Sequence, residues 1–339
     1  MKKYNVAIVG ATGAVGEALI TILEERDFPV ERLFPLASER SAGSTIMFRN
    51  KPIKVQNLAE FDFSSADIGL FSAGGTVSAE FARKAGDCGC IVIDNTSYFR
   101  YEDDIPLVVP EVNPEKISEY VNHNIIANPN CSTIQMLVAL KPIHDAVRVK
   151  RISVATYQAV SGTGKTAVEE LAKQTAELLN GRDAEYSVYP RQIAFNVLPH
   201  IDKFLENGYT KEEMKMHWET RKIFDDNDIM VSATCVRVPV FYGHSEAIQV
   251  ETEGKLTRKE AQMLLEAAAG VELVDGHSDT NYPTAFHDSA GRDAVFVGRV
   301  REDLTVPNGL NLWVVADNVR KGAALNSVQI AEELIKSYL

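Results

Sequence analysis

A glycine-rich turn near the start of the chain is the feature that most constrains its fold. It lies between residues 6–10, an apolar run predicted to be a buried strand, and residues from about 17 to 25, predicted to be a helix. Glycines let the backbone approach a pyrophosphate, and the first turn of a helix offers N–H donors. Because the spacing is G-x-x-G-x-x-G, the flanking strand and helix carry much of the inference. The motif predicts a dinucleotide site, with a turn that binds none as the alternative, at Gly10, Thr12, Gly13, Ala14, Val15 and Gly16.

The apolar runs that follow continue this alternation of strands and helices. Residues 33–37 are predicted to be the second strand, and residues 67–71 and 91–94 the next two. Ligands of open α/β sheets lie at the carboxyl ends of such strands, which makes Ser72 and Gly74 candidate cofactor residues. Residues 1–127 are therefore predicted to form a doubly wound, Rossmann-type domain.

The end of the second predicted strand is where such a domain meets the adenosine ribose. An acidic side chain there selects a free 2′-hydroxyl, whereas an arginine accommodates a 2′-phosphate. Glu39 and Arg40 are both present. These residue types alone therefore leave the choice between NAD and NADP open.

A second constraint is Cys131, which lies at a predicted strand-to-helix turn. Residues 125–127 form a short apolar run, and residues 134–140 an apolar run of helical length. Asn130 or Ser132 can cap the helix. A thiol that faces the positive end of a helix has a lowered pKa, which favours the reactive thiolate. Cys131 is thus a candidate nucleophile, with a buried structural thiol as the alternative.

The pattern changes after this helix. Residues 151–158 and 242–251 alternate like half-buried strands, and residues 312–316 are predicted to be the last strand. Arg237 lies in an apolar strand pattern, where a buried arginine needs a partner such as an anionic substrate group. Residues 193–199 also have apolar strand character.

This region also contains two predicted helices, an amphipathic one at residues 166–180 and a charged one at residues 212–225. Glu219 and Lys222 share one face of the second helix. An ion pair in solvent, which would contribute little, is the alternative reading of these two charges.

Composition excludes several classes of protein. The 339 residues suggest two domains, and 45% apolar and 24% charged residues are typical of a soluble globular protein. The net charge of −12 disfavours nucleic-acid binding. No apolar segment approaches membrane-spanning length, and no signal-peptide pattern is present. The four cysteines have neither zinc nor disulfide spacing, so we predict no metal site and a reducing, cytoplasmic location.

The stretch Asn-Pro-Asn-Cys-Ser-Thr-Ile-Gln, residues 128–135, resembles the active-site signature of aspartate-β-semialdehyde dehydrogenases. The similarity continues through most of the chain. It includes the NADP-binding pattern Ser-x-Arg-Ser-x-Gly at residues 38–43, Asn-Thr-Ser-Tyr-Phe-Arg at 95–100, Gln-x-Val-Ser-Gly-x-Gly at 158–164 and His-Ser-Glu at 244–246.

The resemblance implies a glyceraldehyde-3-phosphate dehydrogenase-like α/β fold. Its dinucleotide-binding domain would comprise residues 1–127 plus 320–339, and its α+β catalytic and dimerisation domain residues 128–319. The implied reaction is NADP-dependent reductive dephosphorylation of β-aspartyl phosphate to aspartate semialdehyde. That step serves the biosynthesis of lysine, threonine, methionine and diaminopimelate.

The same resemblance implies roles for particular residues. Cys131 would be the nucleophile, His244 the acid/base, and Gln158 the group that orients the substrate. Substrate and phosphate would be bound by Arg100, Asn130, Glu219, Lys222 and Arg237, with Arg100 and Lys222 on phosphate, Glu219 on the ammonium and Arg237 on the carboxylate. The 2′-phosphate would be held by Ser38, Arg40 and Ser41, and the nicotinamide would lie near Ser161, Gly162 and Asn318.

Two alternatives remain open from the sequence. One is an N-acetyl-glutamyl-phosphate reductase, which uses the same logic on a longer substrate. The other is a non-catalytic, nucleotide-sensing regulator on the same scaffold. For the favoured reading, the expected partners are the small-molecule substrate, inorganic phosphate and further copies of the chain in a homodimer or homotetramer.

Overall fold

The structure is a computed structural model that describes residues 2–276 and 278–339. The chain forms two compact units, Met1–Pro129 with Ala323–Leu339 (unit 1) and Asn130–Gly322 (unit 2). Among the described residues, no helix combines the length and apolar character needed to cross a membrane.

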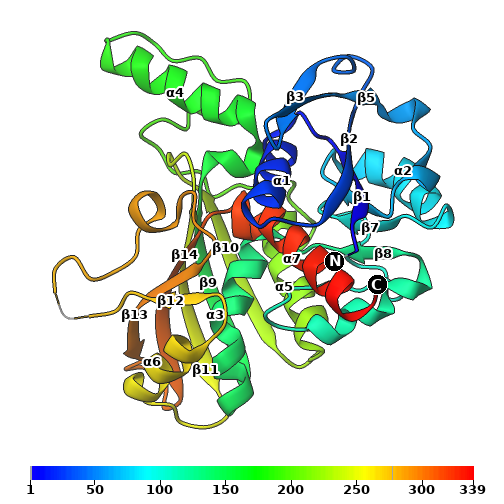
Figure 1. The fold of residues 1–339 in the computed structure, drawn as a ribbon. Coiled ribbons are helices and arrows are strands. Elements are labelled where there is room, and N and C mark those ends of the chain that lie inside the picture. Colours follow the sequence, from blue (N-terminus) through cyan, green and yellow to red (C-terminus); the bar gives the residue numbers. More distant parts are fainter. Residues whose placement is uncertain (1, 277) are drawn as a thin grey trace. The chain divides into compact units, whose positions relative to one another are not determined.

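Unit 1 is built on a parallel sheet with strand order β5-β2-β1-β6-β7-β8 (Figure 1). Its strands are β1 (Tyr4–Val9), β2 (Val30–Ala37), β5 (Gln56–Asn57), β6 (Ile68–Phe71), β7 (Ile91–Asp94) and β8 (Ile125–Ala127). The hairpin β3 (Thr45–Phe48) and β4 (Lys51–Lys54) lies outside this sheet. The strand order reverses between β1 and β6, as in doubly wound folds. The predicted Rossmann-type architecture is confirmed.

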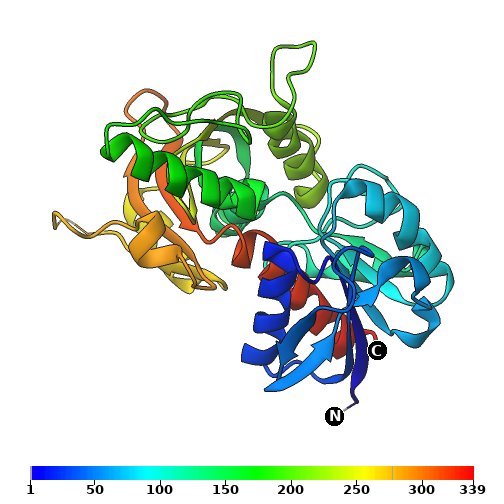
Figure 2. The ribbon, with the colours of Figure 1, turned by 90° about the horizontal axis from the view of Figure 1, so that it is seen from above.

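Helices α1 (Ala14–Glu25), α2 (Gly75–Asp87) and α7 (Leu325–Ser337) complete unit 1, with the short 3₁₀ segments η1 (Leu58–Glu60), η2 (Phe63–Ser65) and η3 (Pro114–Asn122). Figure 2 shows the C-terminal helix α7 beside the N-terminal elements. Leu23 of α1, Leu325 of α7 and Ile8 of β1 belong to one buried cluster. Arg26 also forms a bidentate pair with Glu332, at 2.8 and 2.7 Å. The end of the chain therefore completes the core of the domain that the first residues begin.

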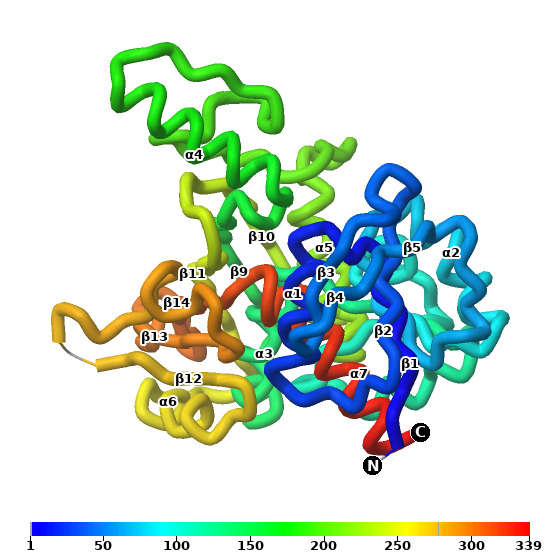
Figure 3. Tube along the Cα trace, turned by 45° about the horizontal axis from the view of Figure 1, so that its top comes forward, coloured from blue at the N-terminus to red at the C-terminus, as the bar shows by residue number. Residues whose placement is uncertain are grey.

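Unit 2 contains a mixed sheet with strand order β10-β9-β11-β14-β13-β12. Its strands are β9 (Val149–Gln158), β10 (Met230–Arg237), β11 (His244–Thr252), β12 (Val271–Leu273), β13 (Val295–Glu302) and β14 (Gly309–Ala316). Its helices are α3 (Cys131–Val147), α4 (Lys165–Leu179), α5 (Lys211–Phe224) and α6 (Arg258–Ala267), with short turns η4 (Val160–Thr163) and η5 (Ala285–Ser289). The short turn η6 (Arg320–Ala324) spans the chain boundary between the two units. Figure 3 traces this order along the Cα positions.

The two faces of this mixed sheet differ in burial. Helices α3, α5 and α6 pack against it, and α3 contacts the central strands β9, β11 and β14. The first three residues of β11 are buried, and from Glu246 onward burial alternates, so Glu246 and Ile248 are buried while Ala247 is half-buried. On the more exposed side, Tyr157 is 39% exposed and packs on Trp313, with ring centroids 5.7 Å apart. Trp313 also lines a 410 Å³ pocket on that side.

Residues 193–199 are not a strand, so that prediction is wrong. They make one isolated bridge, between Leu198 and Arg237. Gln174 of α4 accepts the backbone N–H groups of Ile193 and Ala194, both at 3.1 Å, in place of a strand neighbour. Phe195 has φ 58°, which is incompatible with a continuous extended strand. Ile193, Ala194 and Leu198 join a small core beside α4, whereas the side chains of Phe195 and Val197 are exposed.

Candidate active site

Cys131 is the first residue of α3 and is partly exposed. Asn130 is the N-cap, and its Oδ1 accepts the backbone N–H groups of Ser132 and Thr133 at 3.0 and 3.3 Å. A Cβ at Gly322 would lie 2.7 Å from the Cβ of Cys131, so only glycine fits against the cysteine there. The predicted cysteine at a capped helix start is thus observed.

Three of the predicted residues lie in one row across the sheet of unit 2. Gln158, the last residue of β9, pairs with Arg237, the last residue of β10, and with His244, the first residue of β11. Residues far apart in the sequence are therefore neighbours at one edge of the sheet. The register of three strands produces this arrangement, because each side chain points to the same face.

His244 is fully buried, and its contacts define its ionisation state. The backbone N–H of Ala159 donates to Nδ1 at 3.0 Å, which leaves the proton of the neutral ring on Nε2. Burial and the charge of Arg237 lower the pKa of His244 to about 3, although Glu212 opposes this. Nε2 lies 3.4 Å from Nε2 of Gln158. His244 is therefore held as a neutral imidazole at neutral pH.

Arg237 is 4% exposed and is anchored beside the histidine. Its Nη1 donates to the carbonyl of Ala159 at 2.6 Å, and its guanidinium lies over the ring of Tyr189. Its Nε has no hydrogen-bond partner among the described residues. A Cβ at Gly162 would lie 3.1 Å from Nη1 of Arg237 and 3.2 Å from the ring of His244, so the glycine keeps this space open. A buried cation with an unused donor suits an anionic ligand group.

Helix α5 contributes buried charges to the same region. Glu219 is fully buried, and its Oε2 accepts the backbone N–H of Asn130 at 2.7 Å. Glu212, two turns earlier, is 4% exposed and accepts the side-chain amide of Asn130 at 2.9 Å. The alternative reading, an ion pair in solvent, therefore does not describe Glu219.

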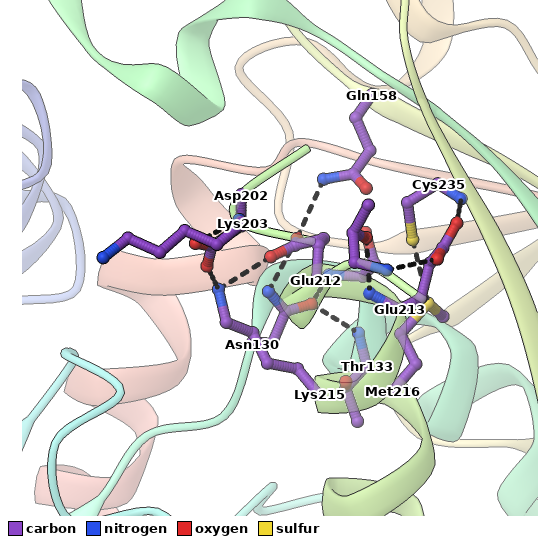
Figure 4. Close-up of polar contacts among 12 residues, drawn as sticks. Asn130, Thr133, Gln158, Asp202, Lys203, Glu212, Glu213, Lys215, Met216 and Cys235 are labelled. Carbon is purple, nitrogen blue, oxygen red and sulfur yellow. Dashed lines mark hydrogen bonds and ion pairs between the residues drawn. The ribbon is translucent and has the colours of Figure 1, made fainter. Parts of the chain in front are cut away.

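Glu212 and Lys215 form an ion pair at 2.8 Å (Figure 4). Neither residue belongs to the site predicted from the sequence. A signal for them exists in the sequence. Glu-x-x-Lys at 212–215 repeats seven residues later as Glu-x-x-Lys at 219–222, so all four charges share one stripe of α5.

Two further predicted residues join this region through one hydrogen-bonded cluster. Oδ1 of Asn318 accepts both the hydroxyl of Ser161 and the backbone N–H of Gly243, each at 3.0 Å. Asn318 follows β14, whose last residue Ala316 pairs with His244. The residues expected near the nicotinamide are therefore brought next to the histidine.

The glycine-rich turn of unit 1 has the geometry of a phosphate site. Gly10 has φ +92°, and a Cβ there would meet the backbone of Ala73 at 3.0 Å. A Cβ at Gly16 would lie 2.1 Å from the carbonyl oxygen of Gly10, which explains glycine at the helix–strand contact. Gly13 caps α1 without a side-chain hydrogen bond. The residues present therefore fit a dinucleotide pyrophosphate at the first turn of α1.

The other predicted cofactor residues of unit 1 surround the strand reversal between β1 and β6. Ser72 follows β6, and its hydroxyl donates to the carbonyl of Val9 at 3.1 Å. Gly74 has φ +99° and is the N-cap of α2. Ser38 and Arg40 are exposed in the turn after β2, closed by a bond from Ser41 N–H to Ser38 at 2.9 Å.

Arg100 lies in the loop after β7 and is 6% exposed. Its Nη2 donates to the carbonyl of Asn95 at 3.1 Å. Asp94 organises this loop by accepting the hydroxyls of Ser78 and Thr96, both at 2.8 Å. Arg100 belongs to unit 1, whereas Lys222 belongs to α5 of unit 2.

The remaining cysteines differ from Cys131. Cys88 is exposed, whereas burial raises the pKa of Cys90 to about 12 and raises that of Cys235 as well. Among the residues that the structure describes, no group of three or more histidine, cysteine, aspartate or glutamate side chains could hold a metal ion.

Comparisons with known proteins place the chain in a family. Residues 5–120 match the semialdehyde dehydrogenase NAD binding domain, and residues 140–321 match the semialdehyde dehydrogenase dimerisation domain. The chain is 62% identical to an aspartate-semialdehyde dehydrogenase of Legionella pneumophila, over 100% of this chain and 97% of the relative. It is 55% identical to the aspartate-semialdehyde dehydrogenase of Aquifex aeolicus, over 99% of each.

Solved structures agree with these relatives. The crystal structure of aspartate semialdehyde dehydrogenase II of Vibrio cholerae complexed with ASA has a TM-score of 0.98 and 60% identity, with all of both chains covered. The enzyme of Candida albicans with NADP has a TM-score of 0.76 and 26% identity, over 98% of this chain and 99% of that one. The predicted fold class and family are confirmed. The chain belongs to the aspartate-semialdehyde dehydrogenase family.

Proposed function

We propose that this protein catalyses the NADP-dependent reductive dephosphorylation of β-aspartyl phosphate to aspartate semialdehyde, through a thioester on Cys131. The observation that carries this proposal is the row of Gln158, Arg237 and His244 at one edge of the sheet, with Gly162 against two of them. Relatives that match over 97% and 99% of their length carry the same enzyme name, which argues against the reductase of a longer substrate and against a non-catalytic regulator.

The first half of the reaction is acyl transfer to sulfur. The Cys131 thiolate attacks the acyl carbon, a C–S bond forms, and the C–O bond to phosphate breaks. The phosphate leaves with the electron pair of that bond, and the family resemblance assigns Arg100 and Lys222 to its charge. The leaving phosphate takes up the proton that balances the overall reaction.

The second half reduces the thioester. A bound NADPH supplies the hydride. The oxygen then carries negative charge, and Nε2–H of His244 is the group that the observed Nδ1 contact leaves available to donate to it. Collapse of this hemithioacetal oxyanion releases the aldehyde and restores the Cys131 thiolate. In this scheme His244 acts as a neutral donor, whereas the resemblance implies an acid/base.

Substrate recognition follows from charge. Arg237 would bind the α-carboxylate, since its guanidinium is buried and one donor is unused. Glu219 would bind the ammonium, since it is a fully buried carboxylate that also accepts the backbone N–H of Asn130 beside Cys131. The side-chain amide of Asn130 is bound at both ends, by the N–H groups of α3 and by Glu212. Asn130 would therefore position neighbouring groups beside the substrate.

The direct test is an assay of NADPH formation from aspartate semialdehyde, NADP and phosphate. Omission of phosphate should stop steady turnover, because the thioester has no acceptor. N-acetyl-glutamate semialdehyde serves as the comparison substrate, since it lacks the free ammonium assigned to Glu219. Faster turnover of that compound would overturn the proposed substrate.

Arg40→Ala is expected to weaken NADP binding far more than NAD binding. Arg40 is exposed in the turn after β2, and only NADP carries the 2′-phosphate that an arginine there accommodates. Fluorescence titration with each cofactor measures the two dissociation constants. Glu39→Gln is the matched control, because it removes the neighbouring charge that opposes the phosphate. Equal losses for both cofactors in Arg40→Ala would show that Arg40 supports the fold instead.

Arg100→Ala is expected to raise KM for phosphate more than KM for aspartate semialdehyde. Phosphate enters only at the thioester stage, so a pre-steady-state burst of NADPH should survive while steady turnover falls. Stopped-flow absorbance at saturating aldehyde measures both phases. Arg100→Lys is the control, which retains the charge but loses the planar fork. Loss of the burst with an unchanged KM for phosphate would assign Arg100 to an earlier step.

We also infer self-association through the more exposed face of the mixed sheet. The dimerisation-domain match covers these strands, and this face carries the Tyr157–Trp313 pair and the 410 Å³ pocket. A homodimer or a homotetramer is consistent with this, and sedimentation equilibrium measures which forms. The reaction also requires a reduced Cys131, which fits a cytoplasmic enzyme.

A further inference from the structure

Glu212 has three polar partners within unit 2 (Figure 4). Its Oε1 accepts from Nδ2 of Asn130 at 2.9 Å and from Nε2 of Gln158 at 3.1 Å. Its Oε2 accepts from Nζ of Lys215 at 2.8 Å. One buried carboxylate therefore joins the cap of the Cys131 helix to the glutamine beside His244.

These contacts determine which way each amide points. A carboxylate only accepts, so both amides must present their NH₂ groups to Glu212. Oδ1 of Asn130 then faces the N–H groups of α3, and Oε1 of Gln158 accepts the hydroxyl of Thr156 at 2.9 Å. A side chain at position 212 that can donate a hydrogen bond, or that cannot accept one, would remove this constraint on both amides at once.

Lys215 keeps Glu212 charged and in place. Burial by itself raises the pKa of Glu212, but the charge of Lys215 and the hydrogen bonds from Lys215, Asn130 and Gln158 outweigh it and lower the pKa. Lys215 is in turn held by Asp202 at 2.9 Å. The side chains of Lys215 and Glu212 are 12% and 6% exposed. A buried pair of this kind is strongly destabilised when one partner is lost.

The orientation of Gln158 has a chemical consequence. Its Nε2 lies 3.4 Å from Nε2 of His244, and both nitrogens carry hydrogens when the ring is neutral with Nδ1 as an acceptor. Two donors thus lie side by side, and an oxygen that gains negative charge beside them would be stabilised.

We propose that Glu212 is a positioning residue, which holds the amides of Asn130 and Gln158 in the orientations that the reaction at Cys131 requires. Lys215 acts through it. The inference rests on the proposed function, because the oxygen that the Gln158 and His244 donors serve belongs to the thioester intermediate.

The test is Glu212→Gln, with Glu213→Gln as the matched control. In Glu212→Gln the Lys215 ammonium takes the amide oxygen, which leaves the new NH₂ against those of Asn130 and Gln158. We expect kcat per active site to fall roughly 10- to 100-fold with the dissociation constant for NADP unchanged. Glu213 belongs to the capping box of α5 with Thr210, so the same carboxylate-to-amide change there should leave kcat within about twofold of wild type. An unchanged kcat in Glu212→Gln would overturn the proposal.

Glu212→Leu/Lys215→Met separates positioning from support of the fold. Removing both charges together should raise the melting temperature above that of Glu212→Leu alone, while kcat stays low because the two amides still lack their acceptor. If kcat recovers together with the melting temperature, Glu212 only stabilises the fold.

Alkylation of Cys131 by iodoacetamide, without substrate, makes the test independent of the proposed reaction. The rate at neutral pH should change roughly two- to tenfold in Glu212→Gln, since the cap of α3 is loosened, and should not change in Glu213→Gln. Identical rates in both variants would overturn the link between Glu212 and the Cys131 helix. Wild-type protein that alkylates normally but fails to turn over aspartate semialdehyde would count against the proposed function alone.

Discussion

Cys131→Ala is expected to abolish turnover, with kcat lower by on the order of 10⁴–10⁶-fold, because no other group can form the thioester. Cys131 is the partly exposed cysteine at the start of α3. Binding of NADP at the glycine-rich turn should be retained, since the turn and the cysteine belong to different segments of the chain. The measurements are steady-state NADPH formation and titration of the cofactor.

Cys88→Ala is the control for this variant, because Cys88 is an exposed thiol in unit 1. It should retain full activity and lose only its own alkylation. Mass spectrometry of wild-type enzyme, quenched after it is mixed with aspartate semialdehyde and NADP without phosphate, should find the acyl group on Cys131. Activity retained by Cys131→Ala, or an acyl group on a different residue, would exclude the thioester mechanism.

His244→Asn is expected to lower kcat by roughly 10²–10⁴-fold, whichever way the histidine acts. The comparison with His244→Ala distinguishes the two roles. Asparagine retains an N–H donor, so kcat of His244→Asn should exceed kcat of His244→Ala if His244 is a neutral donor to the oxyanion. Equal activities, with loss of a limb from the pH profile of kcat, would favour the acid/base role. An unchanged kcat in both variants would make His244 a structural residue.

The pH dependence of unfolding gives a second measure of the same residue. The pKa of His244 falls from 6.5 to about 3 because burial and Arg237 disfavour the charged ring. The unfolded chain therefore binds a proton below pH 6.5 that the folded chain excludes. The contribution of His244 to stability is complete above that pH and is lost as pH falls toward 3, at about 1.4 kcal/mol per unit. In His244→Asn the denaturation midpoint should therefore depend less on pH across this window. An unchanged dependence of the midpoint on pH would contradict a neutral, buried ring.

Local patterns determined much of what this sequence predicts. The glycine-rich turn and the cysteine at a helix start each lie within a short stretch, where strand period, helix caps and glycine act on neighbouring residues. Both are observed, at Gly10–Gly16 and at Asn130–Cys131. The Glu-x-x-Lys pattern that repeats after seven residues on α5 is also present in the sequence. The sequence cannot show whether this stripe of charges faces water or the core.

The tertiary structure decided what depends on distant partners. The apolar residues 193–199 resemble a strand, but Gln174 and the positive φ of Phe195 give them a different backbone. The row of Gln158, Arg237 and His244 exists because three strands pair in one register, which no local pattern contains. Glu212 is a buried anchor for the same reason: its desolvation is offset by Lys215, Asn130 and Gln158, and only folding brings the last two to it.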